Sequence, residues 1–340
     1  MRVIHRHYRL GCIAVALVAG IFIAGAHAAD NVAGPPTAAA LPPSWAYPVN
    51  PPLDNFDSKI KLHVPGSTRT FTRAQIEDDF SPPDWHPEDH PPLPEIVAHG
   101  RRPAVLACMK CHLTNGFGHP ESSDLAGLPV SYIQQQVAEF ANGNRKGARA
   151  TSMIPIAKAL TAEELLAAAK YFSQLKPTTS GWRKVVETQT VPVTKLGTGG
   201  MRFAVEGGGT ESIGGRIIEL PQNPQLAERR DSRAGFMALV PAGSLAKGKA
   251  LVTTGGGKTA PCATCHGPDL RGNATHPELK ALGDVPNIIG RSPMYVYRQL
   301  NDIKLGTRGG PVTALMQGEV AALDQSDMVA IAAYLSTASP

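Results

Sequence analysis

The stretch "CMKCH" at residues 108–112 has the same frame as "CATCH" at 262–266: two cysteines separated by two residues and followed directly by a histidine. The 340-residue chain has only five cysteines, so the two motifs use four of them. A structural zinc site needs four ligands close together, whereas the two pairs lie 154 residues apart. A redox dithiol needs no adjoining histidine, and a disulfide within either pair would be strained. None of these three readings explains the complete motif.

Cys-x-x-Cys-His is the attachment signature of c-type haem. The two thiols add to the two vinyl groups of one porphyrin, and the next residue places an imidazole beneath the iron. We therefore predict two covalently bound haem c groups. The predicted attachment residues and first iron ligands are Cys108, Cys111 and His112 in one motif and Cys262, Cys265 and His266 in the other.

An internal repeat supplies a candidate for the second iron ligand. Residues 127–172 align without a gap with residues 290–335 at a constant offset of 163, which pairs Met153 with Met316. Methionine is the usual partner of histidine in electron-carrying c-type haems, although a single methionine more often packs in a core. Both methionines fall in Gly-rich stretches without clear periodicity, which predicts a loop over the far face of each haem. We predict Met153 and Met316 as iron ligands.

Helical periodicity surrounds these residues. Residues 131–143 place Ile133, Val137 and Phe140 on one face. A second helix is expected after Thr161, with Glu164 completing a cap, and the equivalent helix in the other copy is expected to begin near residue 324. We predict an all-α fold with two haem domains in tandem.

With these motifs, the sequence resembles the class I cytochromes c, and more narrowly the two-domain dihaem cytochromes c of bacterial periplasmic respiratory chains. The resemblance rests on both haem motifs and on "FANGNRKGARATSMIPIAKAL" at 140–160, in which Met153, Ala157 and Leu160 are spaced as in that family. It covers residues 96–177 and 241–340. The resemblance implies a carrier of electrons between a dehydrogenase or quinol-oxidising complex and an acceptor such as a terminal oxidase.

The start of the chain indicates export. Arg2, Arg6 and Arg9 precede an apolar run at 11–25, and "AHA" at 26–28 fits a cleavage site. The apolar run is shorter than the ~20 residues that a membrane-spanning helix needs. We expect a cleaved signal peptide, a periplasmic location and no transmembrane span thereafter, while association with the membrane surface stays open.

Two segments differ from the simple family pattern. Residues 29–95 hold 14 of the 30 prolines, which argues against regular helix there, and residues 178–240 contain short β-type pieces broken by glycines. The long linker casts doubt on a simple face-to-face pairing of the haem domains. The predicted segments are a signal peptide at 1–28, a Pro-rich extension at 29–95, a first cytochrome c domain at 96–177, an irregular, partly β linker at 178–240 and a second cytochrome c domain at 241–340.

Charge excludes one class of partner. Without the three arginines of the signal peptide the chain has 30 basic and 28 acidic residues, which is not the balance of a nucleic-acid-binding protein. Redox proteins are the expected partners. Because both irons are expected to carry His and Met, we predict an electron carrier and not an enzyme. Two alternatives stay open: a dihaem cytochrome c peroxidase, which needs one iron with an open position, and a fixed cytochrome subunit of an exported dehydrogenase complex.

Overall fold

The computed structural model describes residues 42–49, 51, 57–177 and 183–338. The predicted signal peptide lies outside these residues. Within the described part of the chain, no helix combines the length and hydropathy needed to cross a bilayer.

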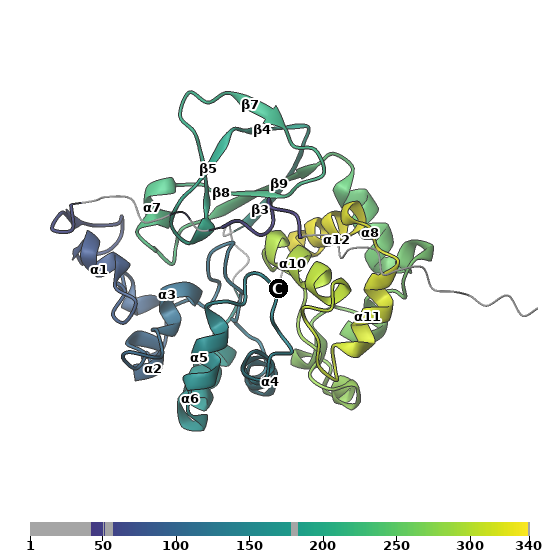
Figure 1. Ribbon diagram of the computed structural model, residues 1–340, viewed down its shortest axis with the longest axis horizontal. Helices are drawn as coiled ribbons and strands as arrows, with labels where there is room; N and C mark the ends of the chain where they lie inside the picture. The colour runs from purple at the N-terminus through teal and green to yellow at the C-terminus, as the bar shows by residue number, and fades with distance from the viewer. Residues whose placement is uncertain (1–41, 50, 52–56, 178–182, 339–340) are drawn as a thin grey trace, which may run out of the picture. The chain divides into compact units, whose positions relative to one another are not determined.

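A first group of helices, here called the first helical group, lies between residues 95 and 174 (Figure 1). Its helices are α2 (Glu95–Ala98), α3 (Cys108–His112), α4 (Val130–Ala141), α5 (Met153–Ala159) and α6 (Ala162–Gln174). The predicted start of α6 is confirmed: the Thr161 side chain accepts from the Glu164 backbone N–H, and the Glu164 side chain accepts from the Thr161 backbone N–H. Tyr171 and Phe172 of α6 are almost fully buried and anchor the core of this group.

The second helical group lies between residues 244 and 337 and is also built of short helices. They are α8 (Ser244–Thr254), α9 (Ala263–His266), α10 (Pro293–Lys304), α11 (Ala314–Ala321) and α12 (Gln325–Thr337). As predicted, α12 begins with a capping box between Asp324 and Asp327. Helix α12 packs on α8, where Gly248 allows close approach to Ala330.

The sequence repeat is a repeat in three dimensions. In the first helical group the backbone N–H of Gly127 donates to the carbonyl of Phe172 at 3.0 Å. In the second, Gly290 donates to Leu335 at 2.9 Å. Both residues of the second pair lie 163 positions after their counterparts. The same closing contact therefore joins the start of the long helix to the end of the last helix in each copy.

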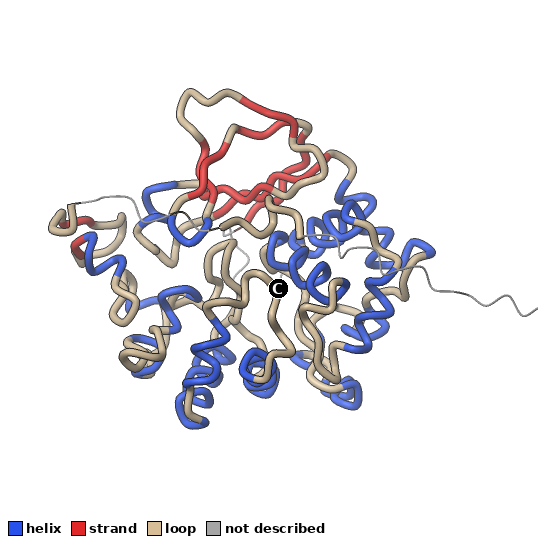
Figure 2. Tube along the Cα trace, in the orientation of Figure 1, coloured by secondary structure: helices blue, strands red, loops and turns tan. Residues whose placement is uncertain are grey.

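The chain between the two groups forms strands (Figure 2). Strand β3 (Arg183–Thr188) runs parallel to β9 (Phe236–Pro241), and β8 (Ile218–Pro221) pairs with β9 antiparallel, which gives the strand order β3-β9-β8. Outside this sheet are the pairs β4 (Thr190–Pro192) with β7 (Thr210–Ser212) and β5 (Thr194–Leu196) with β6 (Arg202–Ala204), and helix α7 (Pro224–Glu228). The short strands predicted in the linker are present, and they continue as far as Pro241. The prediction of an all-α fold is therefore not confirmed for the whole chain, whose two helical groups accompany a small sheet.

The N-terminal extension contains short elements: β1 (Lys61–Leu62), β2 (Phe71–Thr72), α1 (Arg73–Glu77) and a 3₁₀ turn at Pro87–Asp89. The expectation that no regular helix forms here is wrong for α1, which lies in a stretch without proline and is capped by Thr72. Hydrogen bonds tie the extension to the rest of the chain, and two of them are made by aromatic side chains. Tyr47 donates to Asp302 Oδ1 at 2.8 Å, and the indole of Trp85 donates to the carbonyl of Arg229 at 2.7 Å.

Candidate haem-binding sites

The first motif forms the single-turn helix α3, which places Cys108, Cys111 and His112 on the wall of one cavity. Met153 lines the same cavity, which is called the first cavity below. Both thiols are free. Burial, together with the neighbouring Cys111, raises the pKa of Cys108 to about 12. The structure therefore brings the four predicted residues of the first site together.

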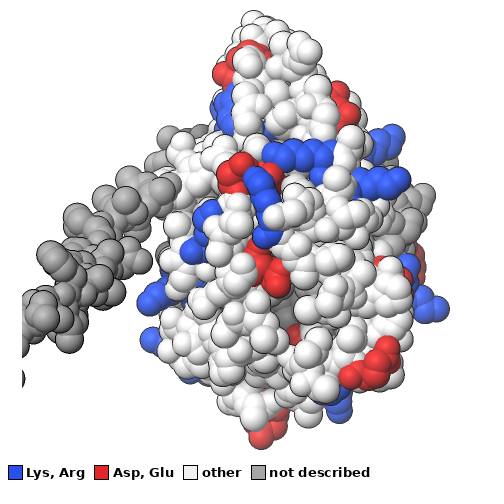
Figure 3. All heavy atoms as spheres, turned by 90° about the vertical axis from the view of Figure 1, so that its right-hand side faces the viewer, with Lys and Arg blue, Asp and Glu red and all other residues white. Residues whose placement is uncertain are grey.

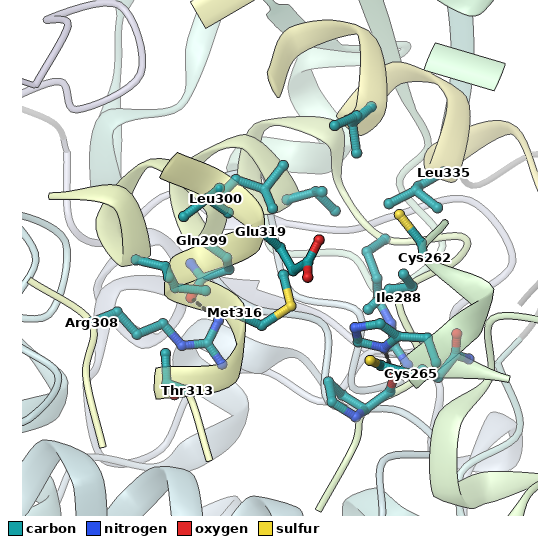
Figure 4. A pocket seen from close by; sticks show the side chains of 18 of the residues that line it. Cys262, Cys265, Ile288, Gln299, Leu300, Arg308, Thr313, Met316, Glu319 and Leu335 are labelled. Carbon is teal, nitrogen blue, oxygen red and sulfur yellow. Dashed lines mark hydrogen bonds between the residues drawn. The ribbon is translucent and has the colours of Figure 1, made fainter. Parts of the chain in front are cut away.

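The second motif repeats this arrangement in the second cavity, which is lined by Cys262, Cys265, His266 and Met316. Figure 4 shows the sulfur of Met316 pointing from α11 into the cavity toward the side on which both cysteines lie. Burial raises the pKa of Cys262 to about 11. The predicted residues of this site also share one cavity.

Each motif histidine is oriented by a backbone carbonyl. Nδ1 of His112 lies 2.9 Å from the carbonyl oxygen of Ser123, and Nδ1 of His266 lies 3.1 Å from that of Pro286. A carbonyl only accepts, so Nδ1 carries the proton and Nε2 keeps the lone pair that binds a metal. Burial lowers the pKa of both histidines, which favours the neutral form that ligation requires.

The role of Ser123 and Pro286 in orienting the two histidines was not predicted from the sequence. They lie 163 residues apart and therefore occupy equivalent places in the repeat. Their side chains are unlike, because only the backbone oxygen is used. Extension of the repeat alignment toward the motifs could have revealed the pair.

The two methionines do not lie in loops as predicted. Met153 is the first residue of α5, and Met316 lies in the first turn of α11. These helices have 7 and 8 residues, too few for periodicity to separate them from a loop. Each methionine nevertheless lines the cavity that contains the cysteines and the histidine of its own copy.

Apolar side chains of equivalent helices form the walls of both cavities. Ile133, Val137 and Phe140 of α4 line the first cavity. The equivalent residues of α10, which are Val296, Leu300 and Ile303, line the second. A pair of thiols, a neutral imidazole, a thioether and apolar walls fit a covalently attached haem.

The two cavities share part of their lining. Tyr295, Gln299 and Arg308 line both. The side chain of Gln299 accepts from Arg145 and from Arg308, each at 2.9 Å, and Gln136 accepts from the same two arginines at 2.9 and 3.1 Å. The doubt about a face-to-face pairing was therefore wrong, since the two helical groups meet through equivalent residues of the repeat.

Comparison with known proteins agrees with the helical pattern and the two motifs. The family model for cytochrome c matches residues 245–339. The thiosulfate dehydrogenase electron acceptor of Thiomonas intermedia (strain K12) is 26% identical over 69% of this chain and 79% of its own length. Cytochrome c-554(548) of Halomonas halodenitrificans (strain ATCC 12084 / NCIMB 8669) is 34% identical over 20% of this chain and 84% of its own length. Cytochrome c4 of Azotobacter vinelandii is 33% identical over 25% of this chain, and the match spans only 40% of that relative.

These features define a c-type cytochrome. The chain belongs to the cytochrome c family, whose members bind haem covalently.

Proposed function

We propose that the protein is a periplasmic dihaem electron carrier, with haem domains at residues 96–177 and 241–340. The observation that supports this most strongly is the equivalence of the two cavities. Each offers two cysteine thiols, a histidine oriented by a carbonyl and a methionine thioether from a short helix. The proposed residues are Cys108, Cys111, His112 and Met153 for one haem and Cys262, Cys265, His266 and Met316 for the other.

A haem in each cavity would supply a one-electron carrier. The chain would hold it by two thioether bonds and by the paired imidazole and thioether ligands. With both axial positions filled by protein, neither site would present an open position to a substrate, and this argues against the peroxidase alternative. The apolar side chains on the walls, together with a Met ligand, would favour a high reduction potential.

The wall shared by the cavities supports electron exchange within the molecule. Tyr295, Gln299 and Arg308 belong to both linings, so at this wall the same side chains border both cavities. Either helical group could then receive an electron from one partner while the other delivers it to a second partner.

The surface is compatible with transient redox partners. On the face drawn in Figure 3, charged side chains of both signs are scattered around a broad uncharged area. Among the described residues of that face, neither sign forms a continuous patch. Partners that dock there would be held by apolar and mixed polar contacts more than by opposite net charge.

A second candidate is the fixed electron-accepting subunit of an exported dehydrogenase. Similarity to the thiosulfate dehydrogenase electron acceptor of Thiomonas intermedia extends over 236 residues, well beyond one haem domain. Oxidation of thiosulfate by a partner enzyme is thus the first donor reaction to examine. The two candidates share their chemistry and differ in whether the partner stays bound.

The haem count and the axial ligands can be tested together. Thioether bonds survive denaturation, so the exported protein should keep two haems per chain in a denaturing gel and by mass. Met153→Ala and Met316→Ala should each remove part of the near-infrared band of ferric Met-ligated haem and lower one midpoint potential. A single haem per chain, or variants with unchanged spectra, would contradict the proposal.

A further inference from the structure

The repeat allows the two cavities to be compared position by position. Most equivalent lining residues have the same charge, as with Arg145 and Arg308 or Gln136 and Gln299. At three equivalent positions the two members differ in charge and line different cavities. Other lining pairs that differ in charge, such as Leu128 and Arg291, have both members in the second cavity.

The first difference is at Arg149, whose equivalent is Val312. Arg149 lines the first cavity and donates to the carbonyls of Pro48 and Gly199 at 3.1 and 2.8 Å. Val312 lines the second cavity. The N-terminal extension and the linker, which have no counterpart in the repeat, therefore hold this guanidinium at the first cavity only.

The second difference lies on the helices that face each other across the shared wall. Arg298 of α10 lines the first cavity, and its equivalent on α4, Gln135, lines the second. The Arg298 guanidinium is buried and donates to the carbonyl oxygen of Pro120 at 3.1 Å. Each cavity is thus covered by the helix of the other group, but only one covering helix brings a positive charge.

The third difference has the opposite sign. Glu319 lines the second cavity three residues after Met316, whereas its equivalent in the first cavity is Ile156. The Glu319 carboxylate accepts a hydrogen bond from the backbone N–H of Ala260 at 2.8 Å. Figure 4 shows it on the same side of the cavity as the Met316 sulfur. The second cavity therefore has a negative charge where the first has an alkyl group.

The complete linings agree with these three positions. Five arginines and two carboxylate side chains line the first cavity. Two arginines and three carboxylate side chains line the second. Since reduction of ferric haem removes one positive charge, cations around a haem favour its reduced state and anions favour its oxidised state.

We propose that the haem held at Cys108 and Cys111 has the higher reduction potential, so that an electron within the molecule moves from the second haem to the first. In this step a haem held by His266 would pass from ferrous to ferric and a haem held by His112 from ferric to ferrous, with no proton or bond exchanged. This inference rests on the proposed function, because it requires both haems. It assigns the one-electron donor protein to the second helical group and the acceptor protein to the first.

The test is a spectroelectrochemical titration of the exported holoprotein, after mass and haem staining have shown two haems per chain. A chain with one haem would contradict the proposed function before the titration begins. With two haems, Arg149→Gln should lower the higher of the two midpoint potentials by up to about 59 mV. For one electron this is about a tenfold change in the reduction equilibrium. Glu319→Gln, which keeps the hydrogen-bonding shape of the side chain, should raise the lower midpoint.

Two controls separate charge from structural disturbance. Arg149→Lys keeps the positive charge and should leave the higher midpoint potential in place. Arg216→Gln removes an arginine that pairs with Glu211 and lines neither cavity, so both midpoint potentials should stay in place. If Arg149→Gln instead lowers the lower midpoint, or Glu319→Gln raises the higher one, the order of the two haems is reversed and the proposal is wrong. It is equally wrong if neither variant moves a midpoint. The Glu319 variant decides the question independently should Arg149→Gln fail to fold.

Discussion

Arg145 and Arg308 lie opposite each other at the contact between the two helical groups, where their backbones form an isolated antiparallel bridge. They are equivalent residues of the repeat, so the contact joins one structural position to itself, as in a two-fold symmetric dimer. The flanking backbone hydrogen bonds obey the same symmetry and have the same length, 2.7 Å: Lys146 to Thr307 and Gly309 to Asn144. The contact therefore has the two-fold pseudosymmetry expected when two copies of one unit meet through the same surface.

The glutamines of this contact hold two guanidinium groups together. Gln299 accepts from Arg145 and Arg308, so Gln299→Leu would leave a charged donor on each arginine without that acceptor. We expect a loss of about 1–3 kcal/mol in the free energy of unfolding, measured by chemical denaturation of the holoprotein. Gln174→Leu, at an exposed position near the end of α6, should change it by no more than about 0.5 kcal/mol. Equal effects of the two substitutions would show that the network adds no stability.

The cap of α12 predicts a pH dependence. A hydrogen bond from the Asp327 backbone N–H holds the pKa of Asp324 below its usual range. Burial alone would raise the pKa of Asp327, but hydrogen bonds from Lys247 and Lys258 lower it. A carboxyl group whose pKa is lowered on folding stabilises the protein at neutral pH, and this stabilisation is lost as the pH falls through the folded pKa.

Asp324→Asn should therefore preserve the cap but weaken the acid dependence of the free energy of unfolding, since asparagine caps a helix as well as aspartate does. Asp324→Ala should remove the cap at every pH, at a cost of about 1 kcal/mol. Unfolding curves recorded between neutral and acidic pH distinguish the two. Parallel pH profiles for the wild type and Asp324→Asn would show that the Asp324 carboxylate is not the origin of the acid dependence.

Local chemistry was predictable from the sequence. The capping boxes at Thr161 and Asp324 involve residues three positions apart, so the short-range pattern contains all the information. The repeat paired Met153 with Met316, and the structure shows both lining a cavity, although in short helices where loops were predicted. It also contained the charge differences, such as Arg298 against Gln135, although which residues face a cavity became visible only in the structure.

The roles of the extension and the linker could not be predicted in the same way. Arg183 contacts Glu219 and Asp124, which are 36 and 59 residues away. Such contacts depend on how the whole chain closes, and neither segment has a second copy in the sequence for comparison. The parallel pairing of β3 with β9 could not be predicted for the same reason, because 47 residues separate the two strands.

The linker's buried ion pair should be important for stability. Nε of Arg183 lies 2.8 Å from Glu219 Oε1, and their side chains are 3% and 1% exposed. Glu219→Gln would leave Asp124 as the remaining carboxylate partner of Arg183 in this buried setting, and we expect a loss of about 1–3 kcal/mol in the free energy of unfolding. Glu211→Gln breaks the half-exposed pair with Arg216 and should cost no more than about 1 kcal/mol. Denaturant titration of both variants tests the contrast, and a Glu219→Gln protein as stable as Glu211→Gln would contradict it.

Two helical glycines predict substitution effects of opposite sign. A Cβ atom at Gly248 of α8 would lie well within van der Waals contact of the Ala330 carbonyl oxygen and 2.8 Å from Cβ of Tyr334, so α8 and α12 would have to separate. Gly248→Ala should cost about 1–3 kcal/mol through overpacking. Gly318 lies within α11 and would meet nothing within 4 Å, so Gly318→Ala should stabilise the helix by about 0.5–1 kcal/mol. Thermal unfolding of the two alanine variants beside the wild type gives both signs at once. If Gly248→Ala proved as stable as the wild type, the close crossing of α8 and α12 would not be a determinant of the fold.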